Sequence, residues 1–246
     1  MTTFEERFLK MVEKSTIHMS LLDPEDLTSE SAADIARRVK AAGTDAFMIG
    51  GSTGVTSENL TEISVAVKKA TGLPVIYFPS DPSAFTKEVD GMFFMSIVNS
   101  RNPDYVMGYH SRVAPFIKAL DVQCISMAYL IIEPGMTVAR VTDAQCIPRD
   151  SPEDAVGYAL AAEYMGFKLI YLEAGSGADN PVPPEMIAAV RKAVKCPIVV
   201  GGGIHTPEQA RAAREAGADA IVTGTFLENC TDDSKLVSVV HAAKGI

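Results

Sequence analysis

The sequence contains no apolar run of the roughly 18 residues that a membrane-spanning helix needs, so an integral membrane segment is not expected. It also lacks an excess of basic residues. The formal net charge is -9 at pH 7, which argues against a nucleic-acid-binding surface. No basic segment followed by an apolar stretch is present at the N-terminus, so a cytoplasmic location is the default expectation.

Cysteine pairs at metal-binding spacing are also missing. The four cysteines lie far apart and form no Cys-x-x-Cys motif: Cys124, Cys146, Cys196 and Cys230. This spacing indicates neither a zinc site nor a disulfide framework, and buried free thiols are the simpler interpretation. No proline-, glycine- or serine-rich tract and no block of like charge interrupts the chain, so residues 1–246 are predicted to form one domain.

What the sequence does have is a regular alternation of short apolar runs with amphipathic segments. The apolar runs of strand type are Thr16 to Leu22, Ala46 to Ile49, Val75 to Phe78, Met92 to Ile97, Ile125 to Ile132, Lys168 to Leu172, Ile198 to Val200 and Ala220 to Thr223. Helical patterns between them include Ser31 to Ala42, Ser57 to Ala70, Pro152 to Met165, Pro184 to Val194 and Pro207 to Ala216. Repeated strand–helix units in a chain of about 250 residues favour an α/β fold, the (β/α)8 TIM barrel. A doubly wound open sheet is disfavoured because no Gly-x-Gly-x-x-Gly motif follows the first strand.

Two connections depart from this regular pattern. Pro79 to Asp90 is barely long enough for a parallel crossover, so the third helix is predicted to be short or irregular. Glu133 to Arg149, after the fifth strand, is long and contains the β-like stretch Thr137 to Val141, which indicates an inserted hairpin or lid. Ordinary loop variation is an equally good interpretation of both connections.

Three glycine-bearing turns follow strand-type runs in the last third of the chain: Tyr171 to Gly177, Ile198 to Gly203 and Ala220 to Thr225. Glycines at strand ends let backbone N–H groups approach an anion, and the last two turns lie where (β/α)8 barrels usually bind phosphate. Glu173, inside the first turn, could act as a general base on a phosphorylated substrate, or it could cap the turn. Tyr171 points the same way in a strand and could contact the same substrate.

A candidate metal site lies at the ends of the first two strands. Asp23 follows the first strand, and Ser52 lies in the glycine turn after the second. A carboxylate and a hydroxyl, completed by waters and substrate phosphates, could bind Mg2+. Asp23 could equally cap the turn that Pro24 opens.

Several of these strings together resemble the geranylgeranylglyceryl phosphate synthase family, archaeal enzymes of ether-lipid synthesis. The strings that carry the resemblance are Asp23-Pro24, Gly50 to Thr53, Asn99-Ser100, Asn102-Pro103-x-Tyr105-x-x-Gly108-x-His110, Tyr171 to Gly177, Gly201 to Ile204 and Gly224-Thr225. They span nearly the whole chain. The family implies transfer of a geranylgeranyl group from geranylgeranyl diphosphate to the 3-hydroxyl of sn-glycerol 1-phosphate, with Mg2+ and release of diphosphate.

Carried over to this sequence, the resemblance implies that Asp23 and Ser52 hold Mg2+ and that Glu173 takes the proton from the attacking hydroxyl. It further implies a binding site for sn-glycerol 1-phosphate made of Tyr171, Leu172, Glu173, Ala174, Gly175, Ser176, Gly177, Gly202, Gly203, Gly224 and Thr225. Family members are dimers or larger, and this variant resembles the hexamer-forming group, so a homo-oligomer is expected.

Tyr105 is a candidate for the residue that limits the length of the prenyl chain, since it lies on a helix that would wall an apolar groove beside Pro79 to Asp90. An ordinary half-buried helix aromatic is the alternative. Two other functions stay open: a heptaprenylglyceryl phosphate synthase, which differs in donor length, and a phosphate-binding isomerase or lyase with the same glycine turns. The second usually needs another acid–base residue or lysine at a strand end, and the sequence offers no such lysine.

Overall fold

The computed structural model describes residues 2–25, 27–51, 53–79, 82–224 and 230–246. Eight parallel strands form one closed barrel in chain order, and β1 closes it by pairing with β8. The strands are β1 (Ile17–Leu22), β2 (Ala46–Ile49), β3 (Val75–Tyr77), β4 (Gly91–Ile97), β5 (Cys124–Ile131), β6 (Leu169–Glu173), β7 (Ile198–Gly201) and β8 (Ala220–Thr223). The predicted (β/α)8 barrel is confirmed, and each predicted strand agrees with the observed one to within about a residue at either end.

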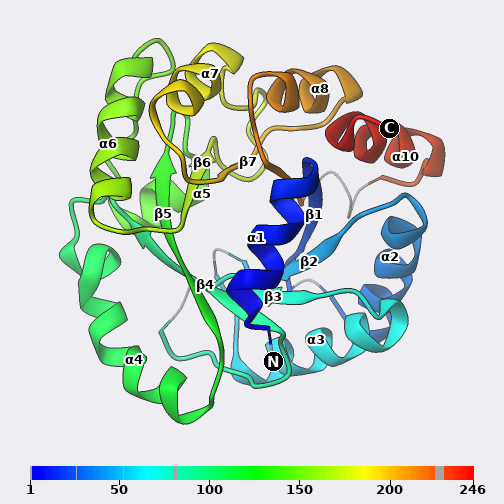
Figure 1. Cartoon of the computed structure of the whole chain (residues 1–246). Coiled ribbons are helices and arrows are strands. Elements are labelled where there is room, and N and C mark those ends of the chain that lie inside the picture. Colours follow the sequence, from blue (N-terminus) through cyan, green and yellow to red (C-terminus); the bar gives the residue numbers. More distant parts are fainter. Residues whose placement is uncertain (1, 26, 52, 80–81, 225–229) are drawn as a thin grey trace.

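Helices surround the barrel, as Figure 1 shows. The described helices are α1 (Phe4–Lys14), α2 (Ser29–Ala41), α3 (Ser57–Thr71), α4 (Tyr109–Ala119), α5 (Met136–Thr142), α6 (Pro152–Tyr164), α7 (Pro184–Ala193), α8 (Pro207–Glu215), α10 (Asp233–Lys244) and the π-helical turn η1 (Asp104–Gly108). Thr28, Thr56 and Thr206 begin α2, α3 and α8 with reciprocal capping hydrogen bonds, which fix where each loop at the barrel mouth ends. Within the described ranges, no helix is both long enough and apolar enough to cross a membrane.

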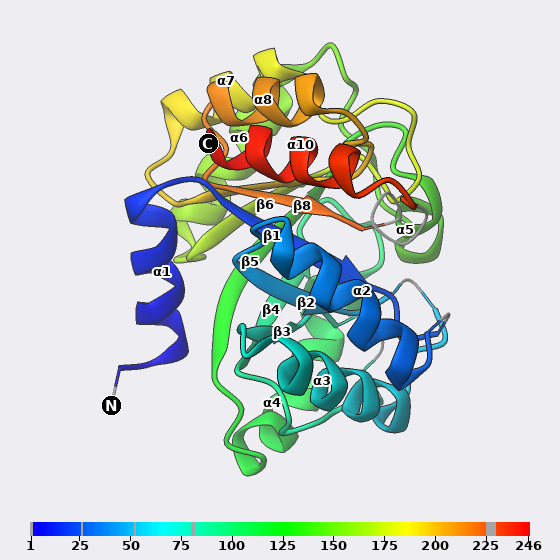
Figure 2. The same ribbon diagram turned by 90° about the vertical axis from the view of Figure 1, so that its right-hand side faces the viewer.

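Helix α1, which the strand–helix alternation did not predict, closes the amino-terminal end of the barrel. Figure 2 shows it at the end opposite α5. Phe8 of α1 makes an edge contact with Phe93 of β4, with 5.4 Å between ring centroids, and both rings are buried. Gly91 leaves space for the Phe4 ring, because a Cβ at that position would overlap it. The floor of the barrel is therefore filled by side chains, and the active site is expected at the carboxyl ends of the strands, as in other barrels of this kind.

The two irregular connections differ in how well they were predicted. Between β3 and β4 the described residues form no helix, which confirms the short or irregular third helix. The insertion after β5 is a helix, α5, so the predicted hairpin with β-like Thr137 to Val141 is wrong. Gly135, with a φ of 68°, ends the extended chain before α5. Val138, Val141 and Thr142 of this helix line the cavity at helical spacing, and Thr142 is buried, so tertiary contacts override the preference of these residues for strands.

Alternate residues of each strand belong to two separate apolar layers. Along β6, Leu169 and Tyr171 lie inside the barrel, whereas Ile170 and Leu172 lie between the barrel and the helices. This alternation determines which residues of a strand end can reach a site inside the barrel mouth.

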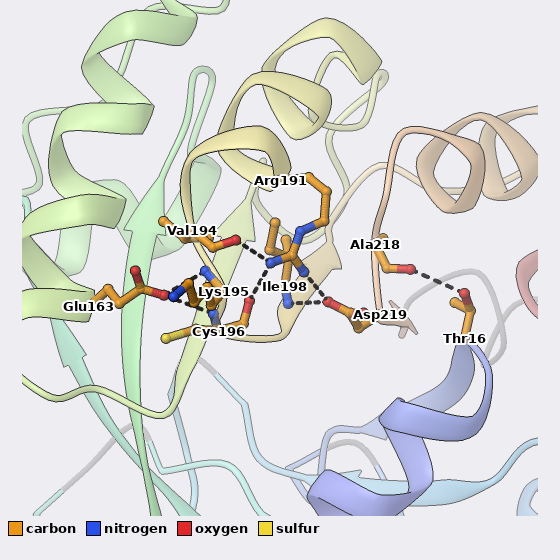
Figure 3. Close-up of polar contacts among 9 residues, drawn as sticks. All are labelled: Thr16, Glu163, Arg191, Val194, Lys195, Cys196, Ile198, Ala218 and Asp219. Carbon is orange, nitrogen blue, oxygen red and sulfur yellow. Dashed lines mark hydrogen bonds and ion pairs between the residues drawn. The ribbon is translucent and has the colours of Figure 1, made fainter.

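A network of polar contacts joins the amino-terminal edges of β7 and β8 (Figure 3). Arg191 of α7 makes an ion pair with Asp219 at 2.8 Å, and the same carboxylate accepts a hydrogen bond of 2.7 Å from the backbone N–H of Ile198. Glu163 of α6 accepts hydrogen bonds from the backbone N–H groups of Lys195 and Cys196, which lowers the pKa of its carboxyl group. These contacts fix the end of the barrel that lies away from the mouth.

Candidate active site

A cavity of about 610 Å³ opens among the loops at the carboxyl ends of the strands. This volume lies within the range of roughly 300–1,000 Å³ that is typical of small-molecule sites. One part is polar and is lined by loops after β6, β7 and β8, including Ser176, Gly177, Gly202, Gly203 and Gly224. The other part is apolar and is lined by side chains of β4, η1 and α4, including Met92, Phe94, Tyr105, Tyr109 and Val113.

Glu173, the last residue of β6, lines the cavity and is only 5% exposed. Its Oε1 accepts a hydrogen bond of 2.6 Å from the backbone N–H of Gly175. Its Oε2 accepts one of 3.0 Å from the hydroxyl of Tyr129, and Tyr171 is close enough to affect the pKa of the carboxyl group. Tyr171 and Glu173 therefore face the same side, as strand alternation predicted, and the bond from Gly175 is the turn-capping contact that the sequence also allowed.

Burial raises the pKa of the Glu173 carboxyl group, and the hydrogen bonds from Gly175, Tyr129 and Tyr171 oppose this shift. Burial also raises the pKa of the Tyr129 and Tyr171 phenols well above their usual value, and the charge of Glu173 adds to the effect. Both tyrosines therefore remain protonated donors at neutral pH. A buried carboxylate with a raised pKa, placed at the wall of a cavity, has the properties of a general base.

The glycine turns of the polar part pack closely on one another. Gly202 and Gly203 have φ values of 79° and 71°, which other residues rarely adopt. A Cβ at Gly202 would overlap Oε1 of Glu173, and a Cβ at Gly203 would lie 2.6 Å from the backbone of Asn180. The backbone at these two positions can therefore approach a bound anion without an intervening side chain.

The predicted substrate-binding residues divide into four groups. Seven of them line the cavity: Tyr171, Glu173, Ser176, Gly177, Gly202, Gly203 and Gly224. Leu172 and Ala174 are buried between the barrel and the helices, because alternate residues of this segment face outward. Gly175 donates its N–H to Glu173 and lies behind the cavity wall. Thr225 lies outside the described residues.

Arg149 joins the two loops that support the glycine turns. Its guanidinium group donates hydrogen bonds to the carbonyl oxygens of Glu133, at 3.2 Å, and Pro181, at 2.7 Å. Pro181 packs against Gly203, and the turn that follows Glu133 packs against Gly175. One side chain that does not touch the cavity therefore connects the insertion after β5 to the polar part of the site.

Asp23 follows β1 and lines the cavity opposite the β6 turn. One carboxylate oxygen accepts a hydrogen bond of 3.1 Å from the backbone N–H of Glu25, so the turn-capping interpretation is correct in part. Gly51 packs directly against the carboxylate, where a Cβ would overlap both oxygens. Ser52, the other predicted metal ligand, lies outside the described residues.

The donor set at this position fits Mg2+ only with help from a substrate. Throughout the described part of the chain, no three His, Cys, Asp or Glu side chains come together in a way that could hold a metal ion. One carboxylate beside the bare backbone of Gly51 suits Mg2+, because this ion often takes one or two protein carboxylates and several phosphate oxygens.

Tyr105 lies on the wall of the apolar part, where a residue that limits chain length would have to be. Its ring makes an edge contact with Tyr109, with 5.2 Å between centroids, and the guanidinium of Arg112 lies 4.8 Å from the centroid of the Tyr109 ring. The hydroxyl of Ser96 donates a 2.7 Å hydrogen bond to the carbonyl oxygen of Val106 within η1. The wall around Tyr105 is therefore held by contacts on both sides.

Sequence reasoning missed Tyr129 and Phe78, which also line the cavity. Tyr129 stands opposite Tyr171 in the register of β5 and β6, which brings its hydroxyl to Glu173. The sequence signal for Tyr129 was that it is an aromatic residue with a hydroxyl group at an inward-facing position of the apolar run Ile125 to Ile132. Phe78 ends the run that forms β3, and nothing in its local pattern sets it apart from a core residue.

Comparison with known proteins gives a consistent result. A sequence profile of the PcrB family matches residues 9–243. Geranylgeranylglyceryl phosphate synthase of Thermococcus gammatolerans is 51% identical over 224 residues, which cover 91% of this chain and 89% of that protein. The enzyme of the same name from Methanosarcina mazei is 45% identical and covers 98% of both chains.

A solved structure has nearly the same fold along its whole length. The crystal structure of (S)-3-O-geranylgeranylglyceryl phosphate synthase from Thermoplasma acidophilum, in complex with its substrate sn-glycerol-1-phosphate, superposes with a TM-score of 0.96. The two sequences are 42% identical, and the match covers 100% of both chains.

Proposed function

The chain belongs to the PcrB family, and from that membership and the geometry of the cavity we propose that it transfers a geranylgeranyl group from geranylgeranyl diphosphate to the 3-hydroxyl of sn-glycerol 1-phosphate, releasing diphosphate. The observation that carries this proposal is the position of Glu173. Its buried carboxylate lies on the wall of a cavity that has a glycine-rich polar part and an apolar part. A prenyltransferase needs these features together: a cradle for a phosphorylated acceptor, a groove for an apolar chain and a base.

In the proposed reaction, the glycine turns at Gly177, Gly202 and Gly203 hold the phosphate of sn-glycerol 1-phosphate through backbone N–H groups. Glu173 accepts the proton of the 3-hydroxyl, while Tyr129 and Tyr171 orient its carboxylate. The oxygen forms the ether bond to the first carbon of the prenyl group as the bond from that carbon to the diphosphate oxygen breaks.

Asp23, with Ser52, is the proposed ligand set for Mg2+. When bound, the ion neutralises charge on the leaving diphosphate. Such help is needed because the described residues that line the cavity include neither lysine nor arginine, and the whole chain carries a net charge of -9.

The other functions considered are less well supported. An isomerase or lyase would share the glycine turns, but the relatives that cover most of this chain are named for prenyl transfer. They are also named for the geranylgeranyl donor, which favours it over a heptaprenyl donor. Assembly into a homo-oligomer stays a prediction, which light scattering of the purified protein would test.

The experiment that tests the proposal is incubation of the protein with sn-glycerol 1-phosphate and either geranylgeranyl or heptaprenyl diphosphate, with product analysis by mass spectrometry. We expect that geranylgeranylglyceryl phosphate and diphosphate form in the presence of Mg2+, and that neither forms when a chelator is added. Preference for the heptaprenyl donor would change the assigned substrate, and the absence of any prenylated product would contradict the proposed reaction.

A further inference from the structure

Three aromatic rings form a closed cluster at the cavity, which we name the aromatic triad: Phe78, directly after β3, Tyr129 of β5 and Tyr171 of β6. The ring centroids lie 5.7 Å apart for Phe78 and Tyr129, 5.8 Å for Phe78 and Tyr171, and 4.8 Å for Tyr129 and Tyr171. All three residues line the cavity. Tyr129 and Tyr171 are buried, whereas Phe78 is half-buried, so Phe78 is the most exposed residue of the three.

The aromatic triad lies directly beside the proposed base. The hydroxyl of Tyr129 is 3.0 Å from Oε2 of Glu173, and the charge of this carboxylate also acts on Tyr171. Gly201 makes room for the Tyr171 hydroxyl, because a Cβ there would overlap it. Any hydroxyl that gives its proton to Glu173 must therefore bind next to these rings, and so must the carbon that this hydroxyl attacks.

The chemistry of the proposed reaction places positive charge at that carbon. The bond between the first prenyl carbon and the diphosphate oxygen breaks, and its electron pair leaves with diphosphate. Until the acceptor oxygen forms the new carbon–oxygen bond and its proton passes to Glu173, the allylic system carries partial positive charge. Aromatic faces attract such charge, and they do so more strongly where water is excluded.

Other candidates for stabilising this charge are few. The described carboxylates that line the cavity are Asp23 and Glu173, and each already has an assigned role. The hydrogen bond from Tyr129 to a carboxylate shifts electron density toward its ring, which makes this ring a better partner for a cation. Phe78 has no polar group, so any effect of its ring on the rate comes from packing or from the π-face.

We propose that the aromatic triad of Phe78, Tyr129 and Tyr171 stabilises the positive charge that develops on the allylic carbon during prenyl transfer, so that these rings are catalytic residues in addition to Glu173. This inference rests on the proposed function. It predicts that the rate of the chemical step depends on the electron density of the Phe78 ring and not only on its shape.

The test replaces Phe78 by phenylalanines with one, two and three ring fluorines, which withdraw electron density while changing the shape little. The single-turnover rate at saturating geranylgeranyl diphosphate and sn-glycerol 1-phosphate should fall in even logarithmic steps, by about tenfold over the series. Phe93 is the matched control, because it is a buried phenylalanine in contact with Phe8 and does not line the cavity. The same series at Phe93 should leave the rate within about twofold, since it changes only core packing.

A second variant separates loss of charge stabilisation from loss of binding. Phe78→Leu should lower the single-turnover rate about tenfold or more while the KM for sn-glycerol 1-phosphate changes less than threefold. A flat fluorine series at Phe78, or an unchanged rate in Phe78→Leu, would overturn the inference while the proposed function stands. If the unmodified protein forms no prenylated product, the proposed function itself fails.

Discussion

Replacement of Glu173 by glutamine separates the chemical role of this residue from its structural role. Glutamine has nearly the same shape, and its amide oxygen can still accept the 2.6 Å hydrogen bond from Gly175. The packing of Gly202 on this side chain is also retained. We therefore expect Glu173→Gln to bind sn-glycerol 1-phosphate within a few-fold of the unmodified protein. Turnover should fall by roughly 10²–10⁴-fold, the usual effect of removing a general base.

The pH dependence gives an independent check of the same assignment. Because burial raises the pKa of Glu173, its active carboxylate form is lost as the pH falls through that raised value. A plot of kcat/KM against pH should therefore show an acid limb in the unmodified protein, and Glu173→Gln should lack that limb. Near-normal turnover in the variant, or an unchanged acid limb, would refute the reasoning.

The raised pKa also predicts the effect on stability. A carboxyl group whose pKa is higher in the folded than in the unfolded protein favours folding while it is protonated, and this contribution is lost as the pH rises through the folded pKa. At neutral pH the charged, buried carboxylate is therefore a net cost to stability. Glu173→Gln should raise the melting temperature measured by calorimetry at pH 8, and the difference should shrink toward pH 4. A lower melting temperature at pH 8 would show that the hydrogen bonds to the carboxylate outweigh its burial.

Three further substitutions test other parts of the site. Asp23→Asn should raise the Mg2+ concentration needed for half-maximal activity. It should also raise the KM for geranylgeranyl diphosphate more than the KM for sn-glycerol 1-phosphate. An equal rise in both KM values would indicate a folding defect instead. Arg149→Ala should raise the KM for sn-glycerol 1-phosphate by roughly tenfold with little change in the KM for geranylgeranyl diphosphate. The reason is that two carbonyl oxygens that support the glycine turns lose their hydrogen bonds from Arg149. A loss confined to thermal stability would contradict this positioning role. Tyr105→Ala should allow the heptaprenyl donor to be used in a competition assay with the geranylgeranyl donor, since only a physical block discriminates strongly between chains that differ in methylene groups. If folded Tyr105→Ala keeps the donor preference of the unmodified protein, another residue limits the length of the prenyl chain.

The sequence was sufficient for the barrel, because its strands are short apolar runs that end in turn residues. The runs Ala46 to Ile49 and Ala220 to Thr223 match β2 and β8 at both ends. It was also sufficient to place Glu173 at the mouth of the barrel, because a carboxylate in a glycine turn at a strand end is a local signal. Helix α1 was missed because it precedes the first strand and so lies outside the alternation of strands and helices on which the prediction relied.

The other differences between prediction and structure arise from contacts between distant segments and from the alternation of side chains along a strand. The segment Thr137 to Val141 belongs to a helix whose residues Val138 and Val141 line the cavity, and the local pattern does not show this tertiary contact. Leu172 and Ala174 were grouped with Tyr171 and Glu173 as one motif, although strand alternation turns them outward. Tyr129 required the register between β5 and β6, which depends on how the whole barrel closes.

The sealed floor of the barrel has a consequence for how the reaction proceeds over time. Because α1 fills the amino-terminal end with Phe4 and Phe8, reactants and products share the mouth as their route. The ether-linked product keeps both the phosphate of one substrate and the prenyl chain of the other, so it occupies both subsites at once and competes with both reactants. Removal of this amphiphilic product from the mouth, by a lipid phase or by the enzyme that consumes it, then determines how long turnover continues.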